Sequence, residues 1–90
     1  MTAVRIPPVL RTQAGNQKQV EVAGATVGEA LDSLIGQFPS LRDQLLTADG
    51  TLNRFVNVYV NGQDVRYLAG LDTPVAAADE VRLLPAMAGG

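Results

Sequence analysis

Hydrophobic and polar residues alternate at the start of the chain, in a way that predicts two strands. Val4 and Ile6 open a short β-prone stretch that continues to positions 9–10. Pro7 and Pro8 interrupt it, and because proline cannot donate to a β-ladder we expect this pair at a strand end or a bulge. Residues 18–22 alternate polar and apolar, which is typical of a half-buried strand. Together the two stretches predict a hairpin with a loose loop.

The next segment changes to a helical period. Thr26 and Glu29 have the spacing of a capping box, in which each side chain accepts a hydrogen bond from the other residue's backbone amide. Pro39 lacks the amide hydrogen that a continuing helix needs, so the helix is expected to end at about Phe38. The apolar residues that recur at helical spacing form one stripe: Val27, Ala30, Leu31, Leu34, Ile35 and Phe38.

Two short segments separate this helix from the next strand. Ser40 is a candidate cap for a second short turn that carries Leu41 and Leu45. Residues 48–53 are predicted to form a loop, with an Asp-Gly pair as its turn signal.

The strongest strand prediction falls on residues 55–60, whose three valines lie on one face. Asn61 and Gly62 follow at once, and both tolerate the positive φ angles of a type I′ turn. This pair therefore predicts a hairpin with a return strand over residues 64–67.

The last predicted strand covers residues 81–84 and is stopped by Pro85. The order strand, strand, helix, strand, strand, strand predicts an α+β fold of the β-grasp (ubiquitin-like) type. It has a mixed five-stranded sheet covered on one face by one main helix. Placing the last strand beside the first, in parallel, makes the helix part of a crossover. We expect a domain over residues 1–85 and a tail over residues 86–90.

Composition excludes several kinds of function. The 90 residues include no cysteine, histidine or tryptophan, and seven basic against nine acidic residues give a net charge of −2. This excludes a thiolate metal site and a cysteine nucleophile, and it removes the commonest general base. We therefore expect no catalytic residue, metal or cofactor, and no nucleic-acid binding. Because these catalytic side chains are missing, we expect that the protein is not itself an enzyme. No targeting or membrane segment is visible, so we expect it in the cytoplasm.

The end of the chain carries the candidate chemistry. After Pro85 come five small, uncharged residues that can span about 17 Å when extended. Gly89 and Gly90 lack Cβ atoms, so they can pass through a channel too narrow for other residues. The reactive group there is the carboxylate of Gly90, which would need activation by another enzyme, most simply by adenylation. A frayed chain end is the plain alternative, and the predicted β-grasp that leads directly into the glycines favours the functional interpretation.

The order of elements, the strand sequence over residues 54–61 (Arg-Phe-Val-Asn-Val-Tyr-Val-Asn) and the ending over residues 84–90 (Leu-Pro-Ala-Met-Ala-Gly-Gly) are informative together. They resemble the ubiquitin-like sulfur carriers of the MoaD/ThiS family over essentially the whole chain. Within it, Arg11, the Gln-Lys pair at 17–18 and the Asp-Val-Arg run at 64–66 look most like the CysO type, which serves cysteine biosynthesis.

The resemblance implies a carrier role. An E1-like enzyme would adenylate Gly90, and a sulfur source would convert it to a thiocarboxylate. Met87, Ala88 and Gly89 would thread into partner active sites. Sulfur would then pass to an activated serine on a PLP-dependent cysteine synthase, and a metal-dependent peptidase would release cysteine. Two rivals are a MoaD-like small subunit of molybdopterin synthase and a ubiquitin-like protein modifier, and a simple interaction module is a third.

Alternation also predicts a docking surface. If the last strand is central in the sheet, Phe55, Tyr59 and Leu84 share the face that the helix leaves uncovered. An exposed apolar patch of this kind marks a partner surface, while a secondary cluster capped by aromatic residues is the alternative. Arg54 and Arg66, each followed by an aromatic residue, imitate a nucleic-acid surface but are expected to be solvated, because the net charge is negative.

Overall fold

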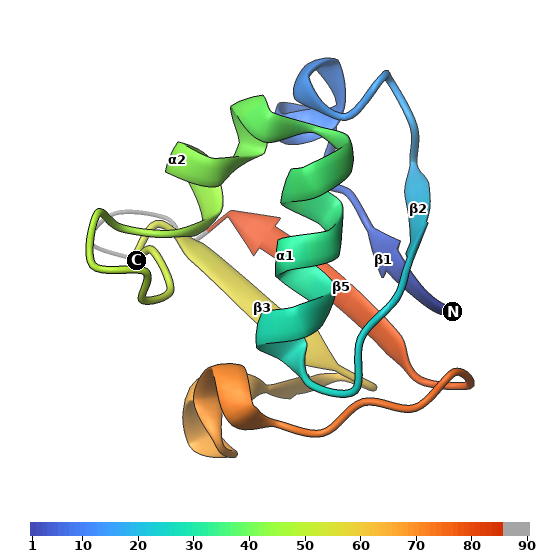
Figure 1. Cartoon of the computed structure of the whole chain (residues 1–90), viewed down its shortest axis with the longest axis vertical. Helices are drawn as coiled ribbons and strands as arrows, with labels where there is room; N and C mark the ends of the chain where they lie inside the picture. Colours follow the sequence, from blue (N-terminus) through green and yellow to red (C-terminus); the bar gives the residue numbers. More distant parts are fainter. Residues whose placement is uncertain (86–90) are drawn as a thin grey trace.

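Five strands form one mixed sheet in the order β2-β1-β5-β3-β4 (Figure 1). The computed structural model describes residues 1–85. The central strand β5 runs parallel to β1 and antiparallel to β3. The two outer pairs are antiparallel, so the predicted β-grasp is confirmed. The strands are β1 (Thr2–Arg5), β2 (Gln19–Val22), β3 (Val56–Val60), β4 (Gln63–Asp64) and β5 (Glu80–Pro85).

The helix α1 (Val27–Gln37) lies across one face of this sheet (Figure 1). The predicted stripe is confirmed, since its first four residues are buried, and Ile35 and Phe38 pack partly buried against the core. At its start, Thr26 Oγ1 accepts the Glu29 amide hydrogen bond at 3.2 Å. The second half of the capping box differs from the prediction, because the Glu29 carboxylate accepts from the amide of Ala25, at 2.9 Å, and not from that of Thr26.

Shorter helices complete the domain. One is the α-helical turn α2 (Arg42–Leu45), and the others are the 3₁₀ segments η1 (Pro8–Gln13), η2 (Pro39–Leu41), η3 (Val65–Tyr67) and η4 (Gly70–Asp72). Among residues 1–85, no helix combines the length and the apolar character that crossing a bilayer requires.

Two predictions around the first loop and the second helix were wrong. Positions 9–10 do not continue a strand but belong to η1, because Pro8 at the first position of that segment presets a helical φ. Ser40 caps nothing: α2 begins after Leu41, and the Ser40 hydroxyl donates to the Gln13 carbonyl at 3.5 Å. The two leucines expected on that turn, Leu41 and Leu45, are buried as predicted.

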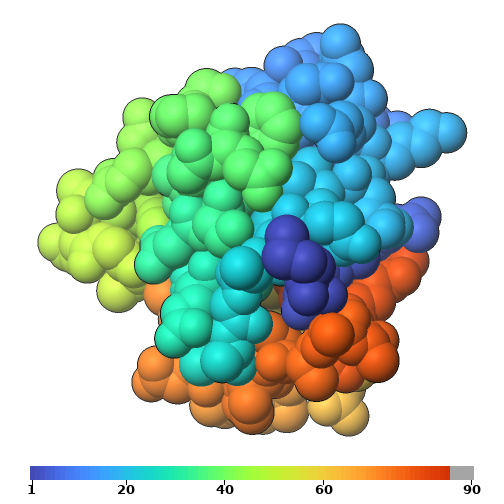
Figure 2. All heavy atoms as spheres, turned by 45° about the vertical axis from the view of Figure 1, so that its right-hand side comes forward, coloured from blue at the N-terminus to red at the C-terminus, as the bar shows by residue number. Residues whose placement is uncertain are grey.

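The hairpin after β3 has the predicted turn but a shorter return strand. Asn61 and Gly62 have φ angles of 51° and 86°, as a type I′ turn requires. The return strand β4 stops at Asp64, however, because the Asp64 carboxylate accepts the Arg66 amide hydrogen bond at 2.9 Å and starts η3. The segment between η4 and β5 packs against the N-terminal strand: Thr2 Oγ1 donates to the Ala76 carbonyl at 3.1 Å. Figure 2 shows the first residues (dark blue) beside this segment (orange).

Candidate functional site

The face of the sheet turned away from α1 carries the polar and aromatic side chains of the strands. In β5, Val81 and Leu83 are buried, whereas Arg82 and Leu84 between and after them are exposed. In β3 the three valines are buried, and Asn57 and Tyr59 are partly exposed. We call this the uncovered face. By the strand register it carries the side chains of Ala3, Arg5, Gln19, Glu21, Asn57, Tyr59, Asp64, Glu80, Arg82 and Leu84.

The register of the central strand places the end of the described chain. Val56 pairs with Pro85, and Asn57 pairs with Leu84, so β5 ends beside the start of β3. The predicted site of chemistry at Gly90, and the tail residues Met87, Ala88 and Gly89, lie outside the described residues. The last residue that the structure describes is Pro85, at the end of β5.

The predicted docking residues fall into two neighbouring hollows. Tyr59 and Leu84 line one hollow of about 310 Å³, together with Arg82. Phe55 precedes β3 and lines another hollow of about 300 Å³, which it shares with Val9 and Pro85. The structure therefore brings Tyr59 and Leu84 together, and it places Phe55, which is 55% exposed, beyond the end of the strand.

Arg66 is a structural residue that the sequence analysis missed. Its guanidinium donates to the side chain of Asn57 and to the carbonyls of Asn53 and Val56, the latter two at 3.0 and 2.9 Å. Arg66 is exposed, as predicted, but it is more than a solvated arginine, because these bonds tie η3 to the start of β3. No periodicity indicated them, since the acceptors lie 9 to 13 residues upstream. Arg54 instead stacks on its neighbour, with Cζ 5.1 Å from the centre of the Phe55 ring.

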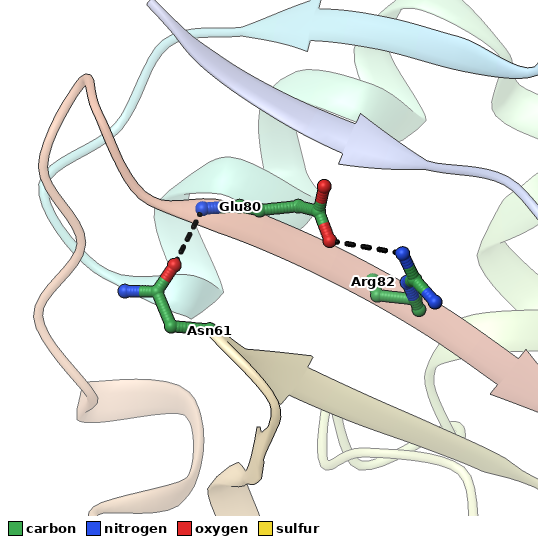
Figure 3. Close-up of polar contacts among 3 residues, drawn as sticks. All are labelled: Asn61, Glu80 and Arg82. Atoms are coloured by element: carbon green, nitrogen blue, oxygen red, sulfur yellow. Dashed lines mark hydrogen bonds and ion pairs between the residues drawn. The ribbon is translucent and has the colours of Figure 1, made fainter.

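A small polar network lies at the opposite end of β5. Asn61 accepts the Glu80 amide hydrogen bond and donates to the Asp79 carboxylate, both at 3.0 Å. The Asn61 bond, followed by one from the Ala76 amide, lowers the pKa of Asp79 below its ordinary value. Glu80 forms an ion pair with Arg82 at 3.1 Å. Figure 3 shows the Asn61, Glu80 and Arg82 contacts, which join the type I′ turn to the central strand.

The described residues were also searched for side chains that could hold a metal ion. Within residues 1–85, no three histidine, cysteine, aspartate or glutamate side chains are placed to hold a metal ion. Asp79, whose pKa is lowered, is engaged in the turn network. Its bonds therefore explain its pKa without a catalytic role.

This chain matches a family model and is similar in sequence and in structure to several known proteins. The model of the ThiS family matches residues 4–90. The sulfur carrier protein CysO of Mycobacterium tuberculosis is 43% identical, over 97% of this chain and 96% of its own length. The crystal structure of the Amycolatopsis orientalis BexX/CysO complex contains a chain with 42% identity, full coverage of both chains and a TM-score of 0.91. Small archaeal modifier protein 1 of Haloferax volcanii is 42% identical, over 80% of this chain and 79% of its own.

Proposed function

The chain belongs to the ThiS family, and from this membership we propose that it is a sulfur carrier of cysteine biosynthesis. In this proposal, residues 1–85 are the domain that enzymes bind, and residues 86–90 are a tail whose Gly90 carboxylate carries the sulfur. The protein acts in the cytoplasm as the substrate of other enzymes and has no catalytic group of its own. The observation that carries the proposal is the 43% identity to CysO over almost the full length of both chains.

The proposed chemistry takes place on partner enzymes. On an E1-like enzyme, a Gly90 carboxylate oxygen attacks the α-phosphorus of ATP, and pyrophosphate leaves. A nucleophilic sulfur then attacks the acyl carbon and expels AMP, which leaves a thiocarboxylate. The thiocarboxylate sulfur would then replace the leaving group of an activated serine on a PLP-dependent cysteine synthase, which joins the new cysteine to the Gly90 acyl carbon. A metal-dependent peptidase would hydrolyse the bond between the Gly90 acyl carbon and the cysteine, which releases cysteine and restores the Gly90 carboxylate.

Two features of the chain support a role as a carrier whose chemistry is performed by other enzymes. Cysteine and histidine are absent and Lys18 is the one lysine, so few side chains could attack an activated acyl end. The central strand β5 is held on both sides, by β1 and by β3. A tail that follows Pro85 would therefore begin from a firmly anchored strand, next to the exposed Leu84.

Intact-mass measurement tests the proposal. The protein is incubated with ATP, sulfide and the E1-like enzyme from the same cells. We expect a mass gain equal to the difference between one sulfur and one oxygen atom, located at Gly90 by fragmentation. Deletion of Gly90 should abolish the gain. Gly36→Ala is the control: a Cβ there meets no atom within 4 Å, so this variant should gain sulfur normally. Conversion of the deletion variant would contradict the proposal.

A protein modifier is the second candidate, because a small archaeal modifier protein matches over 80% of the chain. In that case Gly90 would be found in isopeptide bonds to lysine side chains of other proteins, and never as a thioacid. A MoaD-like role shares the sulfur chemistry, so only the identity of the partner enzyme distinguishes it from a role in cysteine biosynthesis. Copurification with a PLP-dependent synthase supports the cysteine pathway, and copurification with the large subunit of molybdopterin synthase supports the MoaD-like role.

A further inference from the structure

Two arginines lie side by side on the uncovered face. Arg5 in β1 and Arg82 in β5 are register partners in the parallel pair, and both are exposed. With Arg11 they line one hollow of about 140 Å³. Like charges on facing positions of neighbouring strands repel each other and lower stability. The fold therefore gains nothing from this pair, which points to a role in binding.

The three guanidinium groups are only partly engaged. Arg11 is oriented by its Nε, which donates to the Ile6 carbonyl at 3.0 Å. Arg82 contacts Glu80 at 3.1 Å, and both side chains of this ion pair remain nearly half exposed, at 47% and 45%. Within residues 1–85, neither Arg5 nor Arg11 has an acidic partner. Positive charge is thus concentrated at this hollow, whose lining contains no acidic residue, on a chain whose net charge is −2.

The surroundings of the arginines are apolar. The remaining wall of the hollow is built from Ile6, Pro7, Pro8, Leu83 and Leu84. Leu84 also lines the adjoining hollow with Tyr59, so the arginines border the predicted docking surface. Arginine and aromatic residues are enriched in protein–protein interfaces, and apolar walls strengthen a charge contact by limiting its exposure to water.

We propose that Arg5, Arg11 and Arg82 bind an aspartate or glutamate side chain of an enzyme that docks on the uncovered face. The inference rests on the proposed function, because a carrier must be held by the enzymes that act on its tail. A guanidinium group offers paired N–H donors that match a carboxylate. Since the hollow reaches Leu84, one residue before β5 ends, this contact would fix the enzyme relative to the start of the tail.

The test compares charge reversals at matched exposed arginines. Binding of the full chain to its E1-like activating enzyme is measured at low and moderate salt for Arg5→Glu, Arg82→Glu and the double variant. We expect the double variant to bind about tenfold or more weakly and with a smaller salt dependence. The control is Arg42→Glu, which makes the same charge change on α2, outside the hollow, and should bind like the wild type.

Stability and binding should move separately in one variant. Arg5→Glu places an acid beside Arg82 and removes a repulsion, so its melting temperature should equal or exceed that of the wild type while binding falls. Lysine at both positions keeps the charge but loses the paired donors of a guanidinium group, so it should weaken binding less than glutamate does. The inference is wrong if the double glutamate variant binds like the Arg42→Glu control, or if lysine weakens binding as much as glutamate does.

The intact-mass measurement of sulfur addition, made with the same enzyme and the wild-type chain, separates this inference from the proposed function. If the enzyme does not add sulfur to the wild-type chain, the proposed function is wrong, and the inference that rests on it is lost as well. If it does add sulfur and the glutamate variants bind normally, only the arginine contact is overturned.

Discussion

The two faces of the sheet use the same strands for different purposes. On the face under α1, Val58 and Leu83 are fully buried. On the uncovered face, the next residue along each strand is Tyr59 or Leu84, and Leu84 is 38% exposed. Because one face supplies the core, the other can carry residues that the fold does not require, including two adjacent arginines. Exposed residues on these strands are therefore explained by contacts with partners, and buried residues by packing in the core.

The neighbouring leucines of β5 give the sharpest test of this comparison. Leu83→Ala removes a fully buried side chain and should lower the free energy of unfolding by about 2–5 kcal/mol. Leu84→Ala removes a partly exposed side chain and should change it by only about 0.5 kcal/mol, while weakening binding to the activating enzyme. Urea denaturation and a binding titration measure the two effects. Equal destabilisation by both variants would contradict the assignment of Leu84 to the uncovered face, since it would make Leu84 part of the core.

The second test removes the arginine that ties the start of β3 to η3. Arg66→Ala leaves the carbonyls of Asn53 and Val56 without this donor and should cost about 1–2 kcal/mol of stability. The matched control is Arg54→Ala, which within residues 1–85 loses the stacking on Phe55 and should cost about 0.5–1 kcal/mol. If the two losses measured by denaturation are equal, the three hydrogen bonds of Arg66 add nothing to the fold.

The third test asks whether the N-terminal cap of α1 contributes to stability but not to binding. Thr26→Ala removes the side-chain acceptor of the Glu29 amide and should cost about 1 kcal/mol. Binding to enzymes should be unchanged, because the cap belongs to the covered side. Thr47→Ala is a control at a partly exposed threonine whose hydroxyl, within residues 1–85, bonds to that of Thr51. A loss of binding in Thr26→Ala without a loss of stability would contradict the assignment.

Local patterns were sufficient to predict most of the fold. The valines of β3, the apolar stripe of α1 and the Asn61-Gly62 turn each depend on neighbours in sequence, so their periodicity and turn chemistry carried the prediction. The alternation of polar and apolar residues failed to predict the end of a strand where a side chain accepts a backbone hydrogen bond. Asp64 ends β4 by accepting a backbone hydrogen bond two residues later, and alternation alone contains no sign of that.

The candidate site was predictable only in part, because it depends on which strands meet. The exposure of Leu84 and the partial exposure of Tyr59 followed from alternation and from the central place of the last strand. The pairing of Arg5 with Arg82 required the register of β1 with β5, and the Arg66 contacts required the path of the chain after the hairpin. Neither is encoded by a local period.

The smallest expected effect concerns the polar network that holds the turn beside β5. Bonds from Asn61 and from the Ala76 amide lower the pKa of Asp79, so the folded chain favours the ionised carboxylate. Such a group adds stability above its unfolded pKa, and this stability is lost as the pH falls through the lower folded pKa. The wild type should therefore be slightly more stable than Asp79→Asn at neutral pH, and the difference should vanish between about pH 5 and pH 2. Thermal unfolding across this range measures it, with Asp49→Asn in the exposed loop as the control. A difference that persists at low pH would show that Asp79 acts through its shape and not through its charge.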